Sequence, residues 1–272
     1  VNMRGFNTTS PVRSVQFIDG MDNQAPGLNF PVGNLVGAND LDLQSVELIS
    51  GAASALYGPN ALQGVVSMTS KNPYDYQGLS IQLKGGSRNL LDGQFRYAHA
   101  FGAKERLGVK VTGSGMRVND WQATDPVANT YGDISTTQDL SAIVQALQYD
   151  QSLSQEDRDK YIALNNYLDF NPNAYPGKLD INAPGYMEAD LADYTAKSLK
   201  LAAGLHYKLR DSLQLSYDYR LGQGTAVYQG TNRYSINNIL FQQHKVELKG
   251  KHGFIRAYTT QENAGNSYDV VF

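Results

Sequence analysis

Residues 199–209, LKLAAGLHYKL, and residues 213–221, LQLSYDYRL, decide the fold class of this chain. In both stretches apolar residues alternate with polar or small ones, and only the three residues RDS lie between them. Successive side chains of a strand point to opposite faces of a sheet, so this alternation predicts antiparallel strands with one apolar and one polar face. The two stretches therefore predict a mainly β protein.

The same alternation continues on both sides of these stretches. It covers residues 79–83, 94–101 and 107–112, and a weaker alternation covers residues 238–249 and 253–260. Together these segments predict about seven strands.

The connections between the predicted strands differ in length from one side to the other. Short ones lie at 102–106, 209–212 and 250–253, which are every second junction. The junctions between them are a short one at 87–91, a very long one at 118–197 and a medium one at 222–235. Short turns on one side and longer loops on the other are typical of outer-membrane barrels. A soluble β-sandwich produces the same alternation, so both architectures stay open at this point. Aromatic residues near strand ends would suit membrane interfaces: Phe101, Trp121, Tyr207 and Phe254.

The composition excludes several classes of function. The 272 residues include 23 Lys+Arg and 26 Asp+Glu, for a net charge of −3, and this balance argues against binding to nucleic acid. The absence of Cys excludes disulfides and thiolate chemistry. No run of about 18 apolar residues occurs, so transmembrane helices are not predicted. The mean hydropathy of −0.41 remains compatible with membrane strands, which need apolar side chains on one face only.

The segment 118–197 is too long for a featureless loop, so we expect a functional lid or a partly structured insertion. Thr137 is placed to cap a helix, and Ser154 with Asp157 resembles a capping box that opens a second helix. Both helices are expected to end before Pro172, which predicts a helical hairpin on the extracellular face. The apolar positions of the two helices are Leu140, Ile143, Val144 and Leu147, and Tyr161, Leu164 and Leu168.

The sequence contains no convincing catalytic or metal-binding motif. The stretch 58–64, GPNALQG, lacks the spacing and the Lys-Ser/Thr of a phosphate-binding loop. No nucleophile elbow or HExxH motif occurs, and the four His have no clustered partner. Residues 169–173 resemble the start of a calcium loop, but Ala174 stands where Gly is needed, which favours a surface loop. We therefore predict no catalytic residue, no metal site and no cofactor, and the protein is not expected to be an enzyme.

Four ordered motifs lie within the first 73 residues. They are RGF at 4–6, VQFIDG at 15–20, DLQSVELI at 42–49, and GAASALYGPNALQGVV at 51–66, which is followed by TSK. In this order and spacing they closely resemble the plug domain of TonB-dependent outer-membrane receptors. The sequence GPNALQG followed by TSKNPYDYQG resembles receptors of the Bacteroidetes, although it lacks the full signature of the SusC-like glycan importers.

The resemblance implies an architecture, a location and a set of partners. Residues 1–73 would be the C-terminal portion of a small α+β plug domain, and residues 74–272 would be the N-terminal part of an antiparallel transmembrane β-barrel that has about 22 strands in the family. Such a receptor lies in the cell outer membrane, contacts its lipid, binds a ligand at the surface and imports it with energy from the TonB-ExbB-ExbD system. A surface lipoprotein lid is a further partner that the resemblance allows.

The length suggests an incomplete receptor. The region of the TonB box would lie upstream, and about fifteen barrel strands would lie downstream, so the remaining barrel segment would be a necessary partner. Tyr268, Val270 and Phe272 imitate the C-terminal aromatic signal of outer-membrane proteins, but we interpret this as a coincidence because the strands are too few.

The resemblance also assigns roles to single residues. Arg4 matches the plug arginine that pairs with barrel acids, and Glu47 matches an acidic plug position, so both are expected in a plug–barrel ionic lock. Ser50 replaces a second arginine of this lock. The expected plug motif comprises Asp19, Gly20, Tyr57, Gly58 and Gly64, with the glycines serving turn geometry. Ligand contacts are expected from two plug loops, 7–13 and 21–33, through Asn7, Thr8, Arg13, Asn23, Gln24 and Phe30.

Two other functions stay open beside the transporter. The first is a plugged-barrel component of a surface or secretion assembly that acts mainly as a binding module. The second, more distant one is a soluble all-β glycan-binding enzyme. Ligand uptake that depends on TonB would separate the transporter from the binding module, and solubility without detergent would favour the enzyme.

Overall fold

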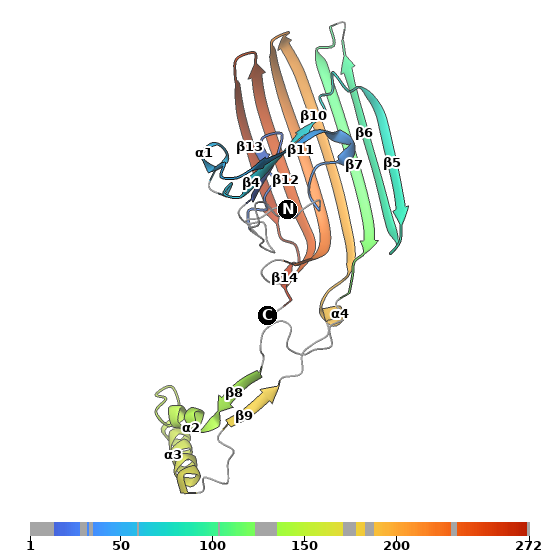
Figure 1. The fold of residues 1–272 in the computed structure, drawn as a ribbon. Helices are drawn as coiled ribbons and strands as arrows, with labels where there is room; N and C mark the ends of the chain where they lie inside the picture. The colour runs from blue at the N-terminus through green and yellow to red at the C-terminus, as the bar shows by residue number, and fades with distance from the viewer. Residues whose placement is uncertain are drawn as a thin grey trace. The chain divides into compact units, whose positions relative to one another are not determined.

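A computed structural model describes residues 14–27, 32, 35–58, 60–102, 104–122, 135–170, 178–182, 188–229 and 233–270. These residues form a four-stranded sheet, an eight-stranded sheet and a two-stranded sheet (Figure 1). The chain divides into two compact units, of which one comprises Val1–Gln122 with Glu188–Phe272 and the other comprises Ala123–Met187. The larger unit holds the first two sheets, and we call the smaller unit the insert.

The four-stranded sheet is built by the first part of the described chain. Its strands are β1 (Ser14–Ile18), β2 (Met21–Asp22), β3 (Leu43–Ser50) and β4 (Gly64–Ser70), in the order β2-β1-β4-β3. Strand β4 runs parallel to β1 and antiparallel to β3. The 3-10 helix η1 (Asp40–Asp42) precedes β3, and the short helix α1 (Ser54–Tyr57) follows it. This unit, here called the plug, has the small α+β fold that the resemblance implies.

The plug has a small core of its own. Val15, Ala61 and Val65 are fully or nearly fully buried, and Phe17 and Tyr57 pack against them. The rings of Phe17 and Tyr57 lie 5.6 Å apart, so a strand of the sheet is joined to the end of α1. Alternate residues of β1 and β4 thus face the same apolar layer.

The eight-stranded sheet is antiparallel and forms the wall beside the plug (Figure 1). Its strands follow the order β13-β12-β11-β10-β7-β6-β5, and β14 also pairs with β12. The bounds are β5 (Gly78–Gly86), β6 (Leu90–Phe101), β7 (Leu107–Asn119), β10 (Thr195–Arg210), β11 (Leu213–Gln229), β12 (Arg233–Gly250), β13 (Phe254–Asn263) and β14 (Tyr268–Asp269). All seven predicted strands are present.

The prediction of a medium-length connection at 222–235 is wrong. Strand β11 continues to Gln229 and β12 begins at Arg233, so most of this segment is paired backbone. The alternation weakens here because the inner side chains pack against an apolar loop of the plug instead of lying in a polar environment. Ile236, Ile239 and Phe241 are buried in that contact.

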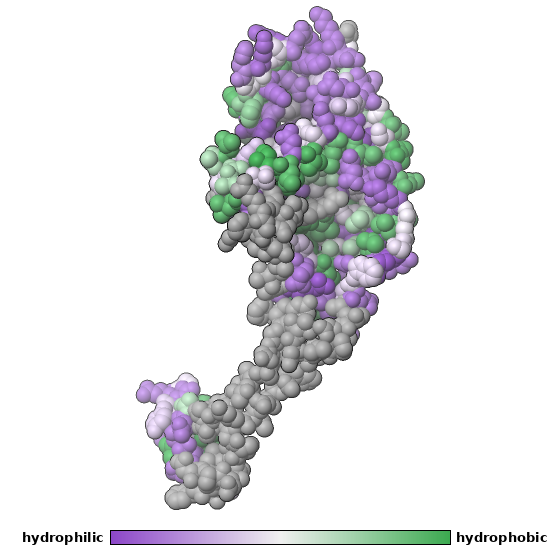
Figure 2. Space-filling model, viewed as in Figure 1, coloured by the Kyte–Doolittle hydropathy of each residue, from purple (hydrophilic) through white to green (hydrophobic). Residues whose placement is uncertain are grey.

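The two faces of the wall are opposite in character to those of a soluble sandwich. On β10 the apolar side chains are exposed, with Leu201 at 43% and Leu205 at 49%, whereas the polar side chains of Lys200 and His206 are both 9% exposed. Figure 2 views the larger unit from the side of the plug and shows apolar residues at its edges beside many polar ones. An apolar outer face with a polar inner face is the arrangement of a membrane barrel wall. The sandwich alternative is therefore wrong.

The insert has its own secondary structure. Strands β8 (Ser135–Asp139) and β9 (Lys178–Asn182) form an antiparallel pair, and helices α2 (Leu140–Gln148) and α3 (Gln155–Phe170) pack against each other. The two predicted helices are therefore present, and their extracellular position stays a prediction. Strands β8 and β9 were not predicted. A fourth helix, α4 (Glu188–Leu191), lies just before β10 in the larger unit. No helix in the described parts of the chain is long and apolar enough to cross a membrane.

The two predicted helix starts in the insert have different outcomes. Ser154 caps α3, because its Oγ accepts from the backbone N of Asp157 at 3.2 Å and donates to the Asp157 carboxylate at 2.7 Å. Thr137 does not cap α2. It lies within β8, where it pairs with Asp180, and helix α2 begins three residues later, at Leu140. Most of the segment that resembles a calcium loop lies outside the described residues.

Candidate functional site: the plug–wall interface

Asp19 joins the plug to the wall at the end of β1. Its carboxylate accepts hydrogen bonds from the backbone N and the Oγ of Ser70, both at 2.7 Å, and it forms an ion pair with Arg220 of β11. Arg220 also donates to the backbone O of Ile18 at 3.1 Å. One wall arginine therefore binds a side chain and the backbone of the same plug turn.

The turn that presents Asp19 requires unusual backbone angles. Asp19 has a φ of 50° and Gly20 a φ of 72°, a region that side chains with a Cβ rarely adopt. The guanidinium of Arg256 lies against Gly20, so a Cβ at this position would displace the end of that side chain. Glycine is needed here for the backbone angles of the turn.

The charge of Asp19 is strongly favoured in the folded state. Burial by itself would raise the pKa of this carboxyl, but the nearby cations Arg220, Lys110 and Lys245 outweigh burial and hold the pKa well below its usual range. The carboxylate is therefore ionised throughout the neutral pH range and acts as a permanent partner of the wall cations.

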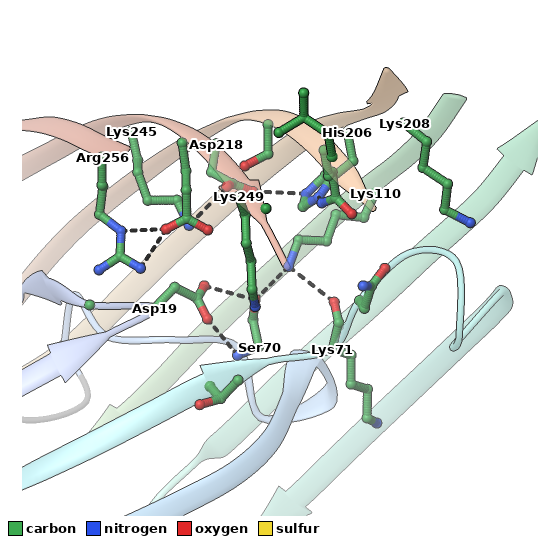
Figure 3. Close-up of a pocket in the computed structure, with 18 of the residues that line it drawn as sticks. Asp19, Ser70, Lys71, Lys110, His206, Lys208, Asp218, Lys245, Lys249 and Arg256 are labelled. Carbon is green, nitrogen blue, oxygen red and sulfur yellow. Dashed lines mark hydrogen bonds and ion pairs between the residues drawn. The ribbon is translucent and has the colours of Figure 1, made fainter. Parts of the chain in front are cut away.

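Asp42, at the end of η1, makes a second connection to the wall. Its two carboxylate oxygens bind Arg96 Nε of β6 at 2.7 Å and Lys110 Nζ of β7 at 3.0 Å. Lys110 also donates to Ser70 Oγ at 2.7 Å and to the backbone O of Lys71 at 3.2 Å. Ser70 binds both Asp19 and Lys110 (Figure 3). Because Lys110 also binds Asp42, the two plug carboxylates belong to one hydrogen-bonded network.

A further buried carboxylate beside this network belongs to the wall. Asp218 of β11 lies 3.2 Å from His206 Nε2 and 3.1 Å from Lys245 Nζ, and all three side chains are at least mostly buried against the plug. Figure 3 shows these groups on the wall facing Asp19 and Ser70 of the plug. The inner face of β10, β11 and β12 therefore offers an ordered set of charges, in which each buried carboxylate has a cation or a histidine beside it.

A plug loop docks on the wall by apolar contacts. Val32, Leu35 and Val36 share a buried cluster with Ile236 and Phe241 of β12. Backbone oxygens of this loop are also bound from β10, since Ser198 Oγ donates to Leu35 at 2.8 Å and Lys200 Nζ donates to Ala38 at 3.2 Å.

Glycines on β11 let the same loop approach the wall backbone. A Cβ built on Gly222 would lie 2.7 Å from the Cβ of Val36, closer than real Cβ contacts. The next plug residue with a wall contact, Asn39, donates its side-chain amide to the backbone O of Gly113 at 2.9 Å and of Phe95 at 3.3 Å. The plug is thus held by apolar packing, by backbone contacts and by ion pairs.

The predicted ionic lock is only partly visible. Arg4 lies outside the described residues, and Glu47 is exposed on β3 with no ion pair to a described residue. Where the lock was expected to join a plug arginine to barrel acids, the observed pairs join the plug carboxylates Asp19 and Asp42 to wall cations. Arg96, Lys110 and Arg220 were not singled out from the sequence. The sequence feature that could have identified them is a positively charged residue at a polar position of a strand with alternating apolar and polar residues.

The other residues of the expected plug motif have different positions. Tyr57 closes α1 against Phe17, and Gly58 follows it with a φ of 97°. Gly64 is not in a turn, contrary to our expectation, because it is the first residue of β4 and pairs with β1 and β3.

The predicted ligand contacts fall into two groups. Asn7, Thr8, Arg13 and Phe30 lie outside the described residues. Asn23 and Gln24 are buried, at 1% and 7% exposed, and their amides bond inside the plug, to Gln16 Oε1 at 3.2 Å and to the backbone O of Ser14 at 3.2 Å. The structure therefore does not place these two at an open surface, because both side chains are buried and their amide nitrogens donate to plug atoms.

Comparison with known proteins identifies the first part of the chain. Residues 1–65 match the family described as the TonB-dependent Receptor Plug Domain. This segment is a TonB-dependent receptor plug domain. The match includes Asp19, Asp42 and the docking loop, so the plug–wall contacts described above connect the TonB-dependent receptor plug with its barrel wall. A search of curated proteins by sequence found no match.

One solved structure supports the assignment of the fold. The chain is similar to the alcaligin outer-membrane receptor FauA from Bordetella pertussis, with a TM-score of 0.51, 10% identity, and coverage of 95% of this chain and 31% of that one. It also matches the siderophore receptor PiuA from Acinetobacter baumannii, with a TM-score of 0.49, 12% identity, and coverage of 93% and 29%. The chain thus spans about a third of the length of these structures. It is a plug with part of an outer-membrane barrel.

Proposed function

We propose that this receptor binds a polar ligand at the cell surface and imports it into the periplasm with energy coupled through TonB. The observation that carries the proposal is the plug domain, which is held against the wall by charged and hydrogen-bonded groups. A plug of this kind blocks the inside of a barrel until a force moves it. The ExbB and ExbD proteins would supply that energy, and a surface lipoprotein lid is a further proposed partner.

The chemistry of the interface suits a plug that moves. Asp19 and Asp42 are bound by cations on β6, β7 and β11 through polar contacts rather than through a continuous apolar core. Water can replace such contacts when the plug is displaced, whereas exposing an apolar surface costs about 25 cal/mol per Å². The small apolar contact of the docking loop is the exception.

The ligand is proposed to contact the side of the wall that carries the insert, together with the plug loops at 7–13 and 21–33. FauA is named as a receptor for alcaligin, and PiuA as a receptor for siderophores. Ferric siderophores are therefore the first probes, with neutral glycans as a second class. The plug domain boundary is proposed at residue 73, between β4 and β5.

The test compares binding with accumulation. Cells that express the receptor, with and without TonB, are given iron-radiolabelled alcaligin and enterobactin and labelled glycans, and surface-bound and internal label are measured separately. For the ligand that binds, we expect internal label only when TonB is present, and equal surface binding in both strains. Equal accumulation without TonB would contradict the proposal.

The insert favours a second candidate function, namely a binding module of a surface assembly. It forms a compact unit of its own with two helices and a strand pair, which is more structure than a simple connection needs. In the same experiment this function predicts surface binding with no internal label in either strain.

A further inference from the structure

A polar cavity lies between the plug and the wall on the side of the short turns. Its volume is about 720 Å³, and it is bounded by the end of β4 on the plug and by the ends of β10, β11 and β12 on the wall (Figure 3). The turn residues Ser212 and Gly250 form part of its lining. A volume of this size is typical of sites for small molecules, which range from roughly 300 to 1,000 Å³.

The cavity is strongly cationic although the whole chain is acidic. Eight Lys or Arg and four Asp or Glu line it, while the chain as a whole has a net charge of −3. Three of the four carboxylates already have cationic partners. Asp19 is paired with Arg220, Asp218 with Lys245, and Glu247 with Arg256. Among the eight cations, Lys245 and Arg256 are used in these pairs and Lys110 binds Asp42 outside the cavity, so five cations remain beside one further carboxylate, that of Asp211.

The uncompensated cations lie around the rim near the turns. Arg210, Lys249 and Lys251 are exposed, and none of them forms an ion pair with a described residue. The Nζ of Lys208 lies 3.9 Å from the ring centre of Tyr74. Lys208 forms no ion pair with a carboxylate of the described residues. Cations grouped in a concave site concentrate the electrostatic potential and attract anions.

We propose that this cavity binds a small multivalent anion, bearing carboxylate or phosphate groups, on the turn side of the plug. Lys249 and Lys251 from β12 and its turn, with Arg210 from β10, would hold the negative groups. The cavity opens on the inner face of the wall, and the apolar outer face is on the other side, so the ligand is a soluble anion rather than a lipid headgroup.

The site deepens the proposed function in one respect. Short turns lie on the periplasmic side of outer-membrane barrels, so the cavity would be where an anionic cargo leaves the plug. It is separate from the proposed surface contacts, which lie on the side of the insert. This part of the inference rests on the transport function, whereas binding of the anion does not.

The experiment measures binding to the purified, detergent-solubilised outer-membrane protein that carries this chain. Citrate and pyrophosphate are titrated by calorimetry at low ionic strength, with the neutral sugar raffinose as a reference. We expect both anions to bind, raffinose to give no saturable heat, and added salt to weaken the anion binding. The K249Q/K251Q variant should raise the dissociation constant by about tenfold, since two partly exposed charge contacts are lost.

Two further variants separate the local site from general charge effects. K249R/K251R keeps both charges and should retain binding. K104Q/K160Q removes two exposed lysines that do not line the cavity, and should leave the affinity unchanged. Unchanged affinity in K249Q/K251Q, an equal loss in K104Q/K160Q, or similar heats for raffinose would overturn the proposal. The titration needs no TonB, so its failure is distinct from a failure of energy-coupled uptake.

Discussion

At the scale of single residues, the plug is held by carboxylates that reach out to wall cations. Asp19 has the densest set of partners, with two hydrogen bonds from Ser70 and an ion pair with Arg220. Both members of the ion pair are mostly buried, so neither charge is well solvated when the other is removed. The attachment of the plug therefore depends on keeping both charges.

The D19N variant is expected to loosen the plug. The change removes the negative charge and leaves the charge of Arg220 unpaired in the interface. We expect the free energy of unfolding to fall by about 2 to 3 kcal/mol, less than for a fully buried pair. Calorimetric unfolding and the rate of trypsin cleavage within the plug provide the measurement. D75N, the same change at an exposed position after β4, is the matched control and should behave like the unchanged protein.

The pH dependence of plug attachment follows from the same carboxyl. The pKa of Asp19 is lower in the folded protein than its ordinary value of 3.8, because the wall cations outweigh burial. The stabilisation that the Asp19 charge gives to the folded protein is therefore complete above pH 3.8. It is lost as the pH falls through the lowered pKa of the folded state. We expect constant trypsin resistance from neutral pH to about pH 5, and a weaker acid dependence of thermal unfolding in D19N. An equal acid dependence in both proteins would refute this explanation.

At the scale of elements, a short apolar loop and a strand with small residues fit together. The loop around Leu35 and Val36 rests on β11, where Gly222 offers no side chain, and on the apolar end of β12. Hydrogen bonds from β10 fix the loop backbone. The extension of β11 and β12 beyond the predicted ends serves this contact.

The G222V variant tests the close approach of loop and strand. The new side chain would collide with Val36, and overpacking of this kind costs about 1 to 3 kcal/mol. We expect the plug to become more sensitive to protease while the wall stays folded, as judged by its circular dichroism. G115V on β7 adds the same side chain where a Cβ meets no atom within 4 Å, and should leave the plug resistant.

At the scale of the whole molecule, the larger unit has its polar residues inside and its apolar residues outside. Leu201 and Leu205 of β10 face outward, whereas Lys200 and His206, the residues next to them in the strand, face the plug. This arrangement is stable only where a lipid layer covers the apolar face, because exposing it to water is costly.

The L201K variant should impair insertion into the outer membrane. A lysine on the lipid face costs about 2 to 4 kcal/mol near the middle of the bilayer. The amount of folded protein in outer-membrane fractions, scored by its altered gel mobility before heating, is expected to fall. Q151K adds the same charge at an exposed position of the insert and should leave that amount unchanged. Normal insertion of L201K would contradict the lipid-facing position.

Much of this architecture was predictable from local sequence. The period of two at residues 199–209 and 213–221 fixes the strands and their two faces, because side chains alternate along any extended backbone. The ordered motifs of the first 73 residues pointed to the plug, and the box of Ser154 with Asp157 located the start of α3. These features depend on neighbouring residues only.

The tertiary structure decided which residues meet. Asp19 and Arg220 are 201 positions apart, and nothing in either local sequence pairs them, so the observed ion pairs join plug acids to wall bases, unlike the expected pairing of Arg4 with barrel acids. From the sequence, Asn23 and Gln24 were expected in an open loop, whereas in the structure their amides bind other atoms of the plug. The sequence by itself determined the strands and their apolar and polar faces, because that information is periodic. The placement of the plug on the polar face, and the cationic cavity beside it, arose only when distant strands were brought together.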